Sequence, residues 1–111
     1  MSTGHEFKKE TTLSVRLVIS MKAAPGKGAE LAQAMAARCR EVQKEPGCLQ
    51  FEVFQSAVEP DKLTLLELWQ DQAALDVHAQ RNASQPPNPA TAGLRAEGPG
   101  EREDYEYNRT R

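Results

Sequence analysis

The chain has no long hydrophobic run and few cysteine, histidine or aromatic residues. No apolar stretch approaches the roughly 20 residues that a membrane-spanning helix needs. Residues 1–10 contain no apolar segment of the kind found in secretory signals. A net charge of −2 gives no basic surface for nucleic acid. These absences predict a cytoplasmic protein that binds neither membrane nor nucleic acid.

Motifs for nucleotide, metal or nucleophilic chemistry are also missing. Gly26-Lys27-Gly28 is too short for a phosphate-binding loop, and no nucleophile elbow is present. Cys39 and Cys48 fit no zinc spacing, so both are expected to be buried, reduced thiols. The two histidines, His5 and His78, lie far apart in the chain, so no metal site is predicted.

The apolar content of the chain is low for a compact monomer. The 111 residues suffice for a single domain, but only 39% are hydrophobic and the mean hydropathy is −0.65. A polar tail, a core shared with a partner chain, or both would account for this shortage. We expect residues 1–12 to be a mobile arm and residues 13–111 to form one domain.

Hydrophobic periodicity predicts an α+β domain. Alternation with period two indicates strands, and steps of three and four residues indicate helices. Pro46 and Gly47 separate the first helix from the strand that follows it, and Asp71 is placed to cap the second helix. The predicted elements are a strand over 13–22, a helix over 27–44, strands over 48–55 and 63–70, and a helix from Asp71 through His78.

The predicted strands carry apolar residues on both faces. Phe54, Leu66 and Leu68 alternate with the residues expected to face the helices. One helix layer covers one face of a sheet, so the other face needs different cover. This pattern predicts a homodimer formed by sheet-to-sheet packing.

The C-terminal third departs from regular structure before it offers a last strand. Residues 84–100 are rich in Pro and Gly and cannot form a regular helix. Within residues 101–110, Tyr105 and Tyr107 alternate with polar residues, as in an edge strand. With this closing strand the order becomes β-α-β-β-α-β, a ferredoxin-like pattern with an antiparallel sheet.

Trp69 and His78 are the residues with the clearest chemical potential, because a strand end and the next helix bring them together. His78 is either a base that titrates near neutral pH or a half-buried histidine bonded to a backbone carbonyl. Glu67 shares the face of Trp69 and needs a partner if it is buried, for which Arg16 is a candidate. Glu45 is expected to end the first helix and belong to the turn.

Arg81 and Asn82, on the second predicted helix, could reach the mouth of a pocket. We interpret them as solvated surface residues.

The chain resembles the antibiotic biosynthesis monooxygenase family over roughly residues 13–81. The resemblance depends on the order and spacing of several short pieces rather than on any one of them. These pieces are Pro25-Gly26-Lys27, Glu45-Pro46-Gly47-Cys48-Leu49, Glu67 with Trp69, Ala73-Ala74-Leu75 and His78. The chain differs from the family after His78, where members have a second amphipathic helical stretch.

The resemblance implies a dimeric α+β barrel with a small apolar pocket in each subunit. It also implies oxidation of a quinol- or anthrone-like substrate by molecular oxygen, with no metal, flavin or other cofactor. His78 would be the base or a hydrogen-bond partner, and Trp69 would be a wall of the pocket. Phe51, Val53, Leu65 and Glu67 are the candidate substrate-binding residues.

Three alternatives remain open. Haem-degrading relatives have an asparagine near the position of Ile19 and one more residue between the Trp and the His, so haem is disfavoured. Isomerases of small carbonyl metabolites need a polar, cationic pocket, whereas the predicted inner faces are apolar. A non-enzymatic small-molecule-binding or stress-related protein is favoured if the pocket is closed and filled. An open cavity that reaches Trp69 and His78 favours the enzyme.

Overall fold

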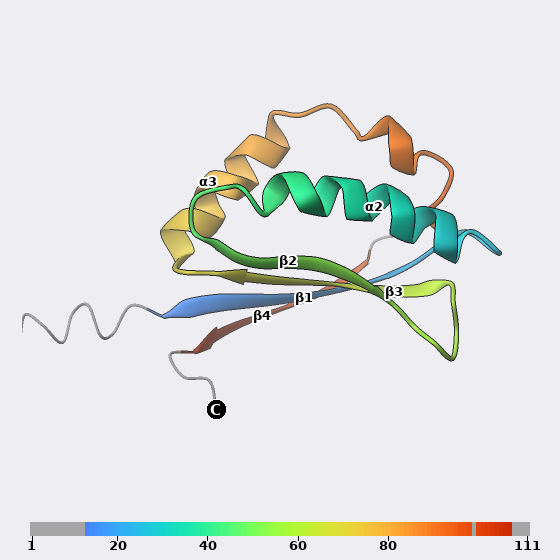
Figure 1. Ribbon diagram of the computed structural model, residues 1–111, viewed down its shortest axis with the longest axis horizontal. Helices are drawn as coiled ribbons and strands as arrows, with labels where there is room; N and C mark the ends of the chain where they lie inside the picture. Colours follow the sequence, from blue (N-terminus) through green and yellow to red (C-terminus); the bar gives the residue numbers. More distant parts are fainter. Residues whose placement is uncertain (1–12, 99, 108–111) are drawn as a thin grey trace, which may run out of the picture.

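The structure is a computed structural model that describes residues 13–98 and 100–107, and it contains one antiparallel sheet with two helices on one face (Figure 1). The strand order is β2-β3-β1-β4, and every neighbouring pair is antiparallel. This confirms the predicted ferredoxin-like α+β class. The elements are β1 (Ser14–Lys22), α2 (Gly28–Val42), β2 (Cys48–Gln55), β3 (Lys62–Trp69), α3 (Gln72–Ala83), the short 3-10 helix η1 (Pro89–Thr91) and β4 (Glu101–Tyr107).

Each helix begins and packs as its sequence suggests. Asp71 caps α3, because its carboxylate accepts a hydrogen bond of 2.8 Å from the backbone N–H of Ala74. In α2, Leu31, Cys39 and Val42 are buried against the sheet. Among the described residues, no helix combines the length and apolar character that crossing a bilayer requires.

The core lies between the helices and the inner face of the sheet. Alternate residues of β1 and β3 point into it, so that Leu17, Leu63 and Trp69 are almost completely buried. Leu31 and Val42 of α2 cover them from the other side and have no exposed surface. The core is thus two layers thick and ends at the sheet.

A β-bulge in β2 changes the predicted face of two residues. Cys48 lies opposite Trp69 and Gln50 lies opposite Leu68, so Leu49 is the extra residue between two paired positions. Cys48 therefore joins the inner face, and Leu49 is 58% exposed. Simple alternation along the predicted strand 48–55 would place Leu49 on the face of Phe51, which is wrong because alternation cannot anticipate an extra residue.

The outer face of the sheet is not covered by either helix (Figure 1). Phe54, Leu66 and Leu68 lie on this face, together with Val18 and Tyr105 of the neighbouring strands. Phe54 is 48% exposed and Tyr105 is 50% exposed. We call these five residues the open face. The predicted apolar character of both sides of the sheet is therefore present.

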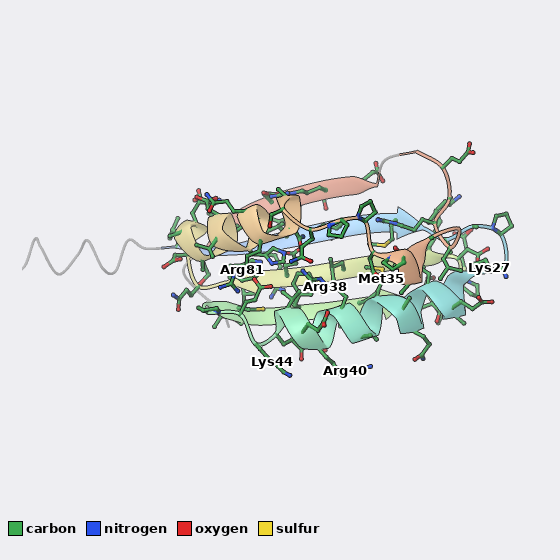
Figure 2. The ribbon with its side chains drawn as sticks, turned by 90° about the horizontal axis from the view of Figure 1, so that it is seen from above. Lys27, Met35, Arg38, Arg40, Lys44 and Arg81 are labelled. Atoms are coloured by element: carbon green, nitrogen blue, oxygen red, sulfur yellow. The ribbon has the colours of Figure 1, made fainter. Side chains whose placement is uncertain are left out.

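After α3 the chain runs beside α2 on the helix side of the sheet and returns to the sheet edge (Figures 1 and 2). Backbone hydrogen bonds hold this segment, from Ala24 N–H to the Leu94 carbonyl at 2.8 Å and from Ala96 N–H to the Lys22 carbonyl at 2.9 Å. β4 then pairs with β1 along seven positions. The predicted arm over 1–12 and the last residues of the predicted closing strand, 108–110, lie outside the described residues.

The start of α2 depends on a close approach to the β2–β3 loop. A Cβ atom on Gly28 would lie 1.9 Å from the backbone carbonyl oxygen of Pro60. The carboxylate of Asp61 holds this junction by accepting hydrogen bonds from the N–H groups of Gly26 and Gly28, at 2.9 and 3.0 Å. No side chain, however small, fits between these two backbones.

We therefore expect Gly28→Ala to lower the free energy of unfolding by about 2–3 kcal/mol, the upper range for overpacking. Urea unfolding of the variant would measure the loss. Ala29→Ser, one residue further at an exposed position, is the matched control and should change stability by less than about 0.5 kcal/mol. Equal stability of the Gly28 variant and wild type would show that the two backbones do not approach this closely.

Candidate functional site

Three rings meet at the end of the sheet where α3 packs. The ring centroids of Trp69 and His78 are 4.7 Å apart with planes tilted by 32°. Phe51 is edge-on to both, with its centroid 5.5 Å from His78 and 6.4 Å from Trp69. Trp69 is fully buried and His78 is 4% exposed. The structure thus brings together the strand-end tryptophan and the helix histidine.

Glu45 holds the imidazole from the turn after α2. Its Oε1 lies 3.0 Å from Nδ1 of His78 and 3.7 Å from the guanidinium of Arg81. Gly47 makes this possible, because it has a φ of +80° and a Cβ there would lie 2.5 Å from the Cβ of Ala74. The partner of His78 is therefore a carboxylate and not a backbone carbonyl. The role of Glu45 was missed, although the Pro46-Gly47 turn that positions it was recognised.

The hydrogen bonds define which nitrogen of His78 is basic. An ionised carboxylate only accepts, so Nδ1 carries the proton that it donates to Glu45, and Nε2 keeps its lone pair. Nε2 faces Nδ2 of Asn82 at 3.4 Å. The guanidinium of Arg38 donates to Oδ1 of Asn82 at 2.8 Å, which fixes the orientation of the amide. Arg38, Asn82, His78, Glu45 and Arg81 thus form one polar chain, which we call the His78 chain.

The interpretation of Arg81 and Asn82 as solvated surface was incomplete. Both side chains are exposed, as expected. However, Arg81 lies within ion-pair distance of Glu45, and Asn82 contacts both His78 and Arg38. The i to i+4 spacing of His78 and Asn82 on one helix was the signal that could have identified this contact.

Glu67 is a buried carboxylate whose partner differs from the predicted one. It is 4% exposed and accepts a hydrogen bond of 2.8 Å from Nε1 of Trp69. Arg16 lies opposite Leu68, on the other face of the sheet, and donates to the side chain of Gln50. Burial raises the pKa of Glu67, whereas the hydrogen bond from Trp69 lowers it less strongly. Arg16 was therefore the wrong candidate for the partner of Glu67.

This raised pKa predicts a pH-dependent effect of Glu67→Gln. Above the ordinary value of 4.5, the folded chain holds the Glu67 proton more tightly than the unfolded chain does. The contribution of Glu67 to stability is therefore present below pH 4.5 and is lost as the pH rises through the folded pKa. The glutamine side chain is neutral at every pH, so its contribution to stability does not fall as the pH rises. Its amide oxygen can still accept the hydrogen bond from Trp69.

Urea unfolding between pH 4 and pH 7 would check this expectation. The stability of Glu67→Gln relative to wild type should increase steadily with pH. Glu52→Gln, at an exposed position on β2, should show no such trend. A difference that stays flat or falls would mean that the carboxylate of Glu67 is not disfavoured by burial.

An open cavity of about 610 Å³ lies between α2, the sheet and the Pro-rich segment. Met35, Phe51 and Leu65 line it from α2 and the sheet, and Pro86 and Pro89 line it from the segment that follows α3. Figure 2 shows Met35 and Arg38 on the side of α2 that faces the other helix, whereas Arg40 and Lys44 point away. The volume is within the roughly 300–1,000 Å³ of small-molecule sites. The sequence did not show what covers the pocket after His78. In the structure, the Pro-rich segment contributes to this cover.

The predicted site residues divide into two groups. Phe51 and Leu65 line the cavity, whereas Val53, Glu67, Trp69 and His78 are not part of its lining. Trp69 is fully buried, so the prediction that it forms a pocket wall differs from the structure. Asn82 and Phe51 both line the cavity and contact His78, and they connect the cavity to the buried rings.

Within the described residues, the thiols and the potential metal ligands form no reactive or metal-binding site. Cys39 and Cys48 are free thiols, and burial raises the pKa of both, that of Cys48 to about 11. They are therefore protonated at neutral pH and poor nucleophiles. Within residues 13–98 and 100–107, no three His, Cys, Asp or Glu side chains are grouped so that they could hold a metal ion.

The fold and the cavity define a ferredoxin-like α+β protein with a cavity between its sheet and its helices. The chain belongs to the antibiotic biosynthesis monooxygenase family, whose model matches residues 14–85. This confirms the family resemblance. The match ends directly before Pro86, so the Pro-rich cover of the cavity lies beyond the matched residues.

Solved structures from several microorganisms have the same fold. A conserved protein from Methanosarcina mazei Go1 has 26% identity and a TM-score of 0.71, covering 88% of this chain and 96% of its own. Protein SO0527 from Shewanella oneidensis has 25% identity and a TM-score of 0.69, covering 87% and 93%. A candidate antibiotic biosynthesis monooxygenase from Caulobacter crescentus CB15 has 24% identity and a TM-score of 0.68, covering 93% and 97%. No curated protein matches the chain.

Proposed function

We propose that the protein is a cofactor-independent monooxygenase that oxidises a small quinol- or anthrone-like aromatic compound with molecular oxygen. Membership of the monooxygenase family supports the reaction type. The single observation that carries the assignment of a base is the His78 chain, in which Glu45 holds Nδ1 and leaves the Nε2 lone pair facing Asn82. The apolar cavity beside it matches a flat aromatic substrate in size.

The chemistry needs a base, a dry site and orientation. His78 Nε2 takes a proton from the substrate, and Glu45 stabilises the imidazolium that forms. The resulting carbanion or phenolate passes an electron to oxygen, and the two radicals combine at carbon to give a peroxide. The imidazolium of His78 returns its proton to the peroxide, and loss of water then gives the ketone, so one oxygen atom enters the product and the other leaves as water. The Phe51, Leu65 and Met35 side chains give the substrate an apolar surface to lie against.

Substrate reaches His78 by displacing Asn82. The contact between Asn82 Nδ2 and His78 Nε2 is 3.4 Å long, which is a weak hydrogen bond. Asn82 is exposed and lines the cavity, so its side chain can turn once its hydrogen bond from Arg38 breaks or moves with it. A substrate hydroxyl in its place would meet the basic nitrogen directly. This movement explains how a base that is 4% exposed can act on a ligand in the cavity.

Oxygen uptake with anthrone and with naphthohydroquinone tests the proposal. His78→Gln should lower kcat by about 10²–10⁴-fold, the usual contribution of a general base. Glu45→Gln should lower it less, because the imidazole keeps a hydrogen-bond partner but loses the negative charge. Gln80→Ala, at an exposed position on α3, should leave the rate unchanged. Uptake that is the same in wild type and His78→Gln would remove His78 from the mechanism.

We also propose that two subunits associate through the open face. Phe54 and Tyr105 are large and half exposed, and Leu66 and Leu68 continue the same surface. Apolar patches of this kind on a sheet are a recognised mark of a protein interface. A second copy of the chain has the same apolar surface, so two open faces can pack against each other. This pairing would complete the dimeric α+β barrel.

Ligand binding without turnover is the second candidate function. Neither Trp69 nor His78 lines the cavity, which is the observation in its favour. The apolar inner faces of the predicted sheet disfavoured the isomerase alternative, but Arg38 and Arg95 line the cavity from outside the sheet. An aromatic ligand that binds tightly, causes no oxygen uptake and dissociates from the protein unchanged would favour binding alone.

A further inference from the structure

Arg95 lies between two cavities. It lines the cavity that holds Phe51 and Leu65, and it also lines a second cavity of about 590 Å³ at the far ends of β1 and β3. Its backbone is fixed, because Arg95 forms a β-bridge with Ala23 and its two neighbours are hydrogen-bonded to the chain around Lys22. A side chain that starts from a fixed backbone position at the boundary of two cavities is well placed to bind a ligand.

The guanidinium of Arg95 has little to bind within the described part of the chain. Its one hydrogen-bond partner there is the thioether sulfur of Met21, at 3.7 Å, and sulfur is a weak acceptor. Arg38, the other cation of the first cavity, is already engaged by Asn82 at 2.8 Å and by Glu41 at 3.6 Å. Most of the five N–H donors of Arg95 therefore remain available to a ligand.

The second cavity places two lysines and two acids on the other side of Arg95. Lys22 and Lys62 lie directly opposite each other on β1 and β3, and both line this cavity. Like charges placed opposite each other on a sheet repel. Lys62 is held by Glu59 at 2.6 Å, whereas Lys22 has no ion-pair partner among the described residues. The same cavity also contains two acids, Glu97 and Glu101.

We propose that the ligand of the first cavity carries an anionic group, and that Arg95 binds this group. This inference rests on the proposed function and specifies the substrate class as an aromatic acid. The aromatic part lies against Met35, Phe51 and Leu65, and the acid points toward the second cavity. A planar guanidinium binds a carboxylate with two parallel hydrogen bonds, which distinguishes an acid from a neutral ligand of the same shape.

A matched pair of redox-inert probes tests this recognition without turnover. Anthracene-2-carboxylate and anthracene-2-carboxamide have nearly the same shape and differ in charge. Trp69 is the only tryptophan of the chain, and Phe51, 6.4 Å from it, lines the cavity. Energy transfer from Trp69 to the bound anthracene therefore reports binding. We expect the carboxylate to bind wild type about tenfold more tightly than the carboxamide, as a charge-assisted hydrogen bond allows.

Arg95→Gln should abolish this preference and leave the affinity for the carboxamide unchanged. Arg40→Gln removes the same charge from the side of α2 that points away from the cavity (Figure 2), and it should keep the preference. Equal binding of both probes by wild type, or a preference that persists in Arg95→Gln, would overturn the inference. Either result would leave the monooxygenase proposal standing, because oxygen uptake from neutral quinols tests that independently. Failure of both probes to bind would overturn the inference as well.

Discussion

The double variant Leu66→Glu, Leu68→Glu is expected to be a folded monomer, whereas wild type is expected to be a dimer. Both leucines lie on the open face, which neither helix covers. In a symmetric dimer each substitution occurs twice, so four carboxylates would enter one apolar interface. Removing them from water without partners costs far more than the association can supply. Sedimentation equilibrium should give a mass of 12.3 kDa for the variant and twice that for wild type.

The control places the same charges elsewhere. Val58 is 89% exposed in the β2–β3 loop and Val77 is 47% exposed on α3, and neither belongs to the open face. The double variant Val58→Glu, Val77→Glu should remain a dimer with unchanged circular dichroism. If wild type itself has a mass of 12.3 kDa at micromolar concentration, the sheet-to-sheet dimer is wrong.

Trp69→Ala is expected to lower the free energy of unfolding by about 3–5 kcal/mol, the range for removing a large buried aromatic side chain. Trp69 has no exposed surface, and its ring packs against both His78 and Phe51. The substitution also leaves the buried carboxylate of Glu67 without the donor that it has at 2.8 Å. For a chain of this size such a loss approaches the whole stability of the fold.

Two further variants separate these contributions. Trp69→Phe keeps most of the volume and removes only the indole N–H, so it should cost clearly less than the alanine variant. Phe54→Ala removes an aromatic ring from the half-exposed open face and should change the stability of the monomeric Leu66→Glu, Leu68→Glu background by less than about 1 kcal/mol. Chemical unfolding of wild type, the two Trp69 variants, the monomeric background and Phe54→Ala in that background would give the comparison. A loss below about 1 kcal/mol for Trp69→Ala would contradict the packing described here.

Local pattern was sufficient for the fold because most elements have a recognisable period and turn or capping residues mark their boundaries. Asp71 predicted the start of α3, and the Pro46-Gly47 break separated α2 from β2. The bulge at Leu49 was not predicted, because an extra residue changes the face of its neighbours without any change in composition. Arg16 was proposed as the partner of Glu67, but the pairing of β1 with β3 places the two residues on opposite faces of the sheet.

The site was predicted only where its residues are close in sequence. Trp69 and His78 are joined by one strand end and one helix, so their proximity followed from the local structure. Glu45 and Arg38 come from the distant α2 region, and their contacts with His78 and Asn82 depend on how α2 and α3 pack. The contribution of Pro86 and Pro89 to the cavity is likewise tertiary, since proline composition excludes a helix but does not say where the chain goes.

The most direct test of the proposed reaction is oxygen-18 labelling of the product. The purified protein, treated with a chelator and given no flavin or haem, would be incubated with anthrone under oxygen-18 gas. The account predicts that the enzyme-dependent anthraquinone contains one atom of oxygen-18 from the gas, and that His78→Gln forms it at about the uncatalysed rate. Anthraquinone formed no faster than without protein, or without the label, would contradict the account.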